Sequence, residues 1–124
     1  MGARYRSGFL PLNGMVEVQV DENGVDAVAK EIDLVVLDVL GPLRTSKTVN
    51  EAAHARLGVA VDRLGVLLES ESLVPKKVVG SLWFIFTSML TEAEQARDPK
   101  QREKIEMTAW DFAERLRRIF GPKF

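Results

Sequence analysis

The chain of 124 residues contains no cysteine and a single histidine, His54. Without cysteine it can form no disulfide, use no thiolate nucleophile and offer zinc no thiolate ligand. The histidine has no adjacent carboxylate or nucleophile, so we interpret it as a surface or boundary residue rather than an acid–base catalyst. Phosphate-binding and nucleophile motifs are also missing. These absences favour a non-enzymatic protein with no cofactor.

Positive and negative charges nearly balance, and the chain has no long apolar run. The formal net charge is −1, which supplies no long-range field for nucleic acid or an anionic membrane, and we expect neither as a partner. The longest uncharged stretch, which contains residues 78–90, is shorter than the roughly 20 residues that span a bilayer. Residues 9–12 are too short and too interrupted for a signal-peptide core, so we expect a cytoplasmic protein.

A doubled heptad is the clearest pattern that the chain does contain. Residues 56–62 and 63–69 both begin Arg-Leu-Gly-Val and both end in an acidic residue. A seven-residue repeat returns each residue type to nearly the same side of an α-helix, which favours lengthwise helix packing. Glycines inside a helix cost about 1 kcal/mol each relative to alanine, so Gly58 and Gly65 need a reason. We expect close approach of a neighbouring helix, with a ligand or a partner backbone in that groove as the alternative.

Hydrophobic periodicity predicts four amphipathic helices within one domain, 1–124. The boundary signals are Gly41-Pro42 as a stop, Thr48 and Glu51 as a capping box, Pro75 as a first-turn proline and Asp98-Pro99 as a cap. The predicted helices cover residues 24–40, 49–69, 75–97 and 99–120.

The first 20 residues are expected to form an N-terminal arm. Residues 15–20 alternate apolar and polar side chains, as in a half-buried β-strand. Asn23-Gly24 would suit a hairpin turn, although the spacing of valines after Gly24 favours a helix there. The predicted fold is therefore all-α, an antiparallel four-helix bundle with a short N-terminal arm or strand.

Each predicted helix carries apolar residues on its back as well as on its core stripe, more than a lone four-helix monomer needs. The N-terminal arm could cover part of this surplus. A protein interface could also cover it, because contiguous apolar patches usually mark interfaces and tryptophan is enriched in their centres. Asp62 would then be a polar residue that sets register or partner choice. The predicted partner-binding residues are Leu34, Leu37, Ala55, Val59, Asp62, Val66, Met107 and Trp110.

We therefore predict a helical interaction or regulatory module that pairs as a homodimer or with another protein. Two alternatives stay open. A small-molecule pocket would be lined by Trp83, Phe86, Met89 and Phe112. A carboxylate-metal hydrolase would use Glu103 and Glu106, although the spacing of these glutamates places them away from the core stripe.

Overall fold

The computed structural model describes the backbone of residues 15–121 and the side chains of residues 24–121. In this part of the chain it contains four helices and no strand. The helices are α1 (Met15–Ser46), α2 (Glu51–Leu68), α3 (Lys76–Gln95) and α4 (Pro99–Phe120). The predicted all-α helical bundle is confirmed.

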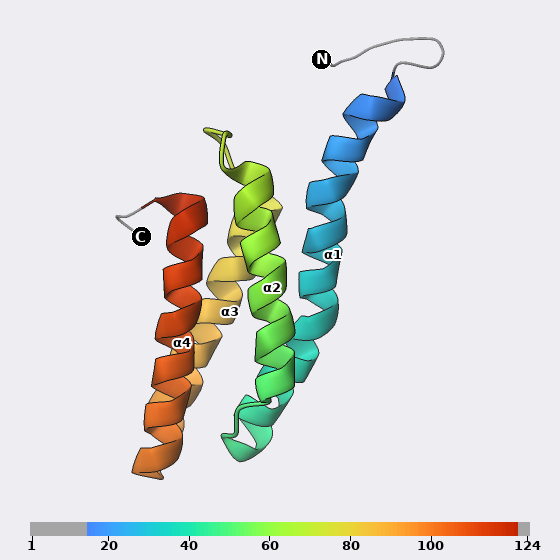
Figure 1. Ribbon diagram of the computed structural model, residues 1–124. Helices are drawn as coiled ribbons and strands as arrows, with labels where there is room; N and C mark the ends of the chain where they lie inside the picture. The colour runs from blue at the N-terminus through green and yellow to red at the C-terminus, as the bar shows by residue number, and fades with distance from the viewer. Residues whose placement is uncertain (1–14, 122–124) are drawn as a thin grey trace.

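Successive helices run in opposite directions and pack as the corners of a square (Figure 1). Helix α1 contacts α2 and α3, and α4 contacts the same two helices. The connection from α2 to α3 therefore crosses the diagonal, and the neighbours α2 and α4 run parallel. Because α2 lies between α1 and α4, its outward side is bordered by a groove on each flank.

The core consists mainly of the apolar stripes that the periodicity predicted, together with Leu43 beyond the predicted end of the first helix. Their members recur every three or four residues, so each stripe lies along one side of its helix and meets the other stripes inside the bundle. Complete burial of a leucine or isoleucine contributes about 1.5–3 kcal/mol relative to exposure. The largest fully buried side chains are Ile32, Leu43, Leu57, Leu64, Leu82, Ile85, Met89, Ile105 and Leu116.

Helix α1 extends past both of its predicted ends. It begins at Met15, so the strand predicted for residues 15–20 is wrong. A lone strand has no partner for its backbone hydrogen bonds, whereas each residue added to an existing helix gains one. At the other end the helix continues through Pro42 to Ser46. The extra turn buries Leu43 completely, and this packing offsets the proline.

The predicted start of α2 is also corrected. Asn50, rather than Thr48, is the N-cap, and its side chain accepts a hydrogen bond from Ala53 N at 3.1 Å. The Thr48 hydroxyl lies 2.8 Å from that of Ser46, so it is engaged at the end of α1. Pro75 is the N-cap of α3, so this helix begins at Lys76, one residue later than predicted.

The predicted start of α4 is correct. Asp98 accepts a hydrogen bond from Lys100 N at 2.9 Å, and Pro99 occupies the first turn. The side-chain amide of Gln101 in the same first turn donates to Ser46 O at 3.5 Å. This bond ties the end of α1 to the start of α4.

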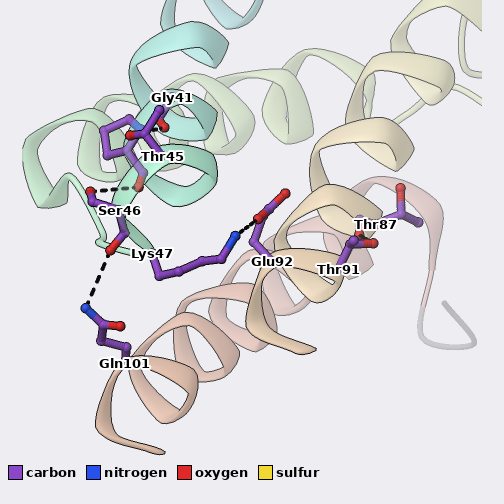
Figure 2. A network of polar contacts seen from close by, with 9 residues as sticks. Gly41, Thr45, Ser46, Lys47, Thr87, Thr91, Glu92 and Gln101 are labelled. Carbon is purple, nitrogen blue, oxygen red and sulfur yellow. Dashed lines mark hydrogen bonds and ion pairs between the residues drawn. The ribbon is translucent and has the colours of Figure 1, made fainter. Parts of the chain in front are cut away.

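A partly buried ion pair holds the α1–α2 loop against α3 (Figure 2). Lys47 has a φ of 55°, in the left-handed region, and its Nζ donates to Glu92 Oε1 at 2.5 Å. Within residues 24–121, Glu92 is the only charged residue that is buried. Because Gln101 binds Ser46 on the same turn, the loop is anchored to both α3 and α4.

Replacing Glu92 with glutamine should lower the free energy of unfolding by about 1–2 kcal/mol, because Lys47 would keep its charge in a partly dehydrated site without its counter-ion. The matched control is Glu94→Gln, an exposed carboxylate on the same helix, which should stay within about 0.5 kcal/mol of the parent chain. Urea unfolding followed by circular dichroism measures both. Equal stability of the two variants would show that the Lys47–Glu92 pair does not hold the loop.

Candidate interaction surface

The outward sides of α1 and α2 carry large apolar side chains in contact with solvent. Leu34 and Leu37 on α1 are 79% and 75% exposed, and Val59 and Val66 on α2 are 61% and 68% exposed. Their positions lie between the members of the buried stripes, so burying the stripes turns these four residues outward. We call Leu34, Leu37, Val59 and Val66 the α1/α2 outer surface.

A groove of about 480 Å³ runs between α1 and α2 beneath part of this surface. Leu34, Ala55 and Val59 line it. Two ion pairs cross the same pair of helices, Arg63 with Glu31 at 2.8 Å and Arg56 with Asp38 at 3.2 Å. All four charged side chains are more than half exposed, so each pair adds at most about 1 kcal/mol to stability. The groove thus has an apolar centre, and two exposed ion pairs bridge the helices on either side of it.

A second groove, of about 520 Å³, lies on the other flank of α2, against α4. Ala55 lines it as well, which places this residue on the ridge between the two grooves. Met107 also lines the second groove and is 66% exposed. Of the predicted binding residues, Leu34, Ala55, Val59 and Met107 therefore border the two grooves beside α2.

Asp62 binds within the chain. Its Oδ2 accepts a hydrogen bond from Arg115 of α4, whose Nη1 also donates to Gly58 O at 3.3 Å. Arg118 Nη1 lies 3.8 Å from Asp62 Oδ1. Hydrogen bonding to Asp62 raises the pKa of the Arg115 guanidinium. This carboxylate therefore fastens α2 to α4 through Oδ2, whereas its buried Oδ1 has no hydrogen-bond partner among the described residues. A role of Asp62 in register or partner choice stays a prediction.

The two glycines of the doubled heptad face α4, as the expected close helix approach requires. A Cβ atom built on Gly58 would lie 2.9 Å from Arg115 Cζ, whereas one on Gly65 would make ordinary contacts of 3.7 Å or more. Gly58 therefore leaves the space that the arginine needs to reach Asp62. Gly65 has no comparable requirement.

His54 lies between α2 and α4, where its Nε2 is buried and has no hydrogen-bond partner among the described residues. Burial lowers the pKa of its imidazole, and the negative charge of Asp111 opposes part of that shift. The neutral form is favoured, which agrees with the interpretation of His54 as a boundary residue.

Trp110 lies on the opposite flank of α4 from Met107, on the side where α3 packs against α4. Its ring centroid is 5.9 Å from that of Phe86, which is in turn 6.2 Å from Trp83. Trp83 and Trp110 are 55% and 56% exposed. Phe84, also on α3, is 52% exposed.

The residues named for the small-molecule pocket include three members of the buried core, Phe86, Met89 and Phe112, whereas Glu103 and Glu106 are exposed. Met89 and Phe112 are core side chains, at 0% and 3% exposure. Glu103 lines the α2–α4 groove, whereas Glu106 lines a different one, between α3 and α4. No group of three or more histidine, aspartate or glutamate side chains in the described part of the chain is placed to hold a metal ion. No helix of that part has the length and apolar character needed to cross a membrane.

Comparisons of the chain with protein-family models, with curated proteins and with solved structures find no match.

The two heptad glycines should respond differently to alanine. Gly65→Ala should raise the free energy of unfolding by about 0.5–1 kcal/mol, through helix propensity. Gly58→Ala should give no gain or a loss, because the new methyl group displaces Arg115 from Asp62 and Gly58 O. In a chain that also carries Arg115→Ala, Gly58→Ala should raise the free energy of unfolding by about as much as Gly65→Ala does in the parent chain. Denaturant unfolding of the four variants measures this cycle, and equal effects at the two glycines would contradict it.

His54 should make stability depend on pH. The pKa of His54 is 6.5 in the unfolded chain and lower in the folded chain, so between these two pKa values the unfolded chain binds more protons. The contribution of neutral His54 to the free energy of unfolding is therefore fully present above pH 6.5 and is lost as the pH falls through the lower pKa of the folded chain. His54→Gln should lack this decline, which unfolding curves recorded at several pH values can check. Since His54 is the only histidine, identical profiles for the two chains would refute the assignment.

Proposed function

We propose that the chain is a non-enzymatic helical interaction module that associates with a second copy of itself through the α1/α2 outer surface. The supporting observation is the exposure of Leu34, Leu37, Val59 and Val66 on two adjacent helices. Apolar side chains gathered in this way favour association, because each leucine or valine that is withdrawn from water contributes about 1–2 kcal/mol.

The charged residues of the same surface also support a protein partner. Arg56, Arg63, Glu31 and Asp38 remain more than half exposed around the apolar residues. A central apolar area with a polar and arginine-containing border is the usual composition of a protein–protein interface. A different protein as the partner, a cytoplasmic location and a small-molecule ligand stay predictions from the sequence.

The direct test replaces one surface residue on each helix. Leu34→Glu combined with Val59→Glu should convert an associated chain to a monomer, because two carboxylates would lose hydration in the contact. The matched control is Leu73→Glu, which changes an 82% exposed leucine in the connection between α2 and α3. Sedimentation velocity at concentrations up to about 100 μM covers the range of weak dimers.

The parent chain and the Leu73→Glu control should sediment as dimers, and circular dichroism should show unchanged helix content in all variants. Trp110→Ala should also remain dimeric, since Trp110 lies on the α3/α4 side. A parent chain that is monomeric throughout this range would overturn self-association. A dimer that persists in the doubly substituted chain would overturn the choice of surface.

A further inference from the structure

We infer that the second copy is related to the first by a two-fold axis parallel to the helices, so that α1 of each copy lies antiparallel across α2 of the other. This inference rests on the proposed function and adds the geometry of the pair. The supporting observation is the distribution of charge along the α1–α2 groove.

Charge is segregated by helix on the two flanks that meet at this groove. The flank of α1 contributes the acids Glu31 and Asp38, and the flank of α2 contributes the bases Arg56 and Arg63. Their side chains are 51–60% exposed, and each guanidinium pairs with a single carboxylate. An arginine has five N–H donors, so both can accept a further carboxylate from outside.

The two simplest symmetric arrangements treat these charges in opposite ways. An axis perpendicular to the helices stacks α1 on α1 and α2 on α2, which sets acids against acids and arginines against arginines. An axis parallel to the helices stacks α1 on α2, which sets each acidic flank against an arginine flank. Juxtaposed like charges disfavour association and opposite charges favour it, so charge complementarity selects the parallel axis.

The positions of the residues along the helix axes also agree with a two-fold axis parallel to the helices. Glu31 is level with Arg63 and Asp38 with Arg56, as their ion pairs show. Leu34 lies between the two acids along α1, and Val59 lies between the two arginines along α2. A parallel axis keeps every residue at its own level, so Leu34 of one copy meets Val59 of the other. A perpendicular axis through the middle of the groove would bring Leu34 against Leu34.

The absence of cysteine makes this geometry directly testable. Two separate chains, Leu34→Cys and Val59→Cys, are mixed and oxidised, and intact mass identifies each disulfide-linked product. A disulfide requires Cα atoms about 4.4–6.8 Å apart. We expect the mixed Leu34→Cys/Val59→Cys product to form at least about tenfold faster than a mixture of Leu34→Cys with the Leu73→Cys control, because docking raises the effective concentration of the two thiols.

Sedimentation of each reduced variant separates the possible failures. If the variants are dimers and Leu34→Cys links mainly to itself, the parallel axis is wrong and self-association stands. If they are dimers and the mixed product forms no faster than the control, the parallel axis is also wrong. If the parent chain is monomeric, the proposed function fails and the inference fails with it.

Discussion

Burial of four apolar stripes in one core sets the rotation of every helix about its own axis. Once Ile32, Leu57, Leu82 and Ile105 point inward, the side chains between the stripes have nowhere to go but outward. The exposure of Leu34, Leu37, Val59 and Val66 is therefore a direct consequence of core packing. These apolar residues cannot turn inward without withdrawing a whole stripe from the core, which would cost several kcal/mol.

The two flanks of α2 differ in how far their paired charged side chains are exposed to water. Toward α4, Gly58 leaves room for Arg115, which binds Asp62 and the backbone of α2, so the contact is specific and partly enclosed. Toward α1, the ion pairs of Arg56 and Arg63 are open to water. Partly enclosed charge networks hold a fixed geometry, whereas exposed pairs can exchange partners at little cost. This difference supports the assignment of the α2–α4 flank to the fold and the α1–α2 flank to association.

Much of the fold could be predicted because local patterns agree with tertiary packing. The cap Asp98 and the proline that follows it determined the start of α4, and the stripes identified most of the buried apolar residues. The strand over residues 15–20 was wrong because alternation over a short segment carries no information about a pairing partner. The helix stop at Gly41-Pro42 was wrong because burial of Leu43 outweighs the proline, and that burial depends on helices distant in sequence.

The sequence by itself determined that four helices form, which side of each is apolar, and that apolar residues remain on the opposite sides, because these properties follow from the 3.6-residue period. Only the tertiary structure decided which helices are neighbours. The pairing of α1 with α2 places Leu34 and Val59 beside one groove, and the pairing of α3 with α4 places Trp110 on another side of the bundle. The diagonal connection from α2 to α3 sets α4 beside α2 and so brings Arg115 to Asp62 across 53 residues of sequence. Periodicity determines which side of a helix faces the core. Which helices become neighbours depends on how the four apolar stripes pack together in that core.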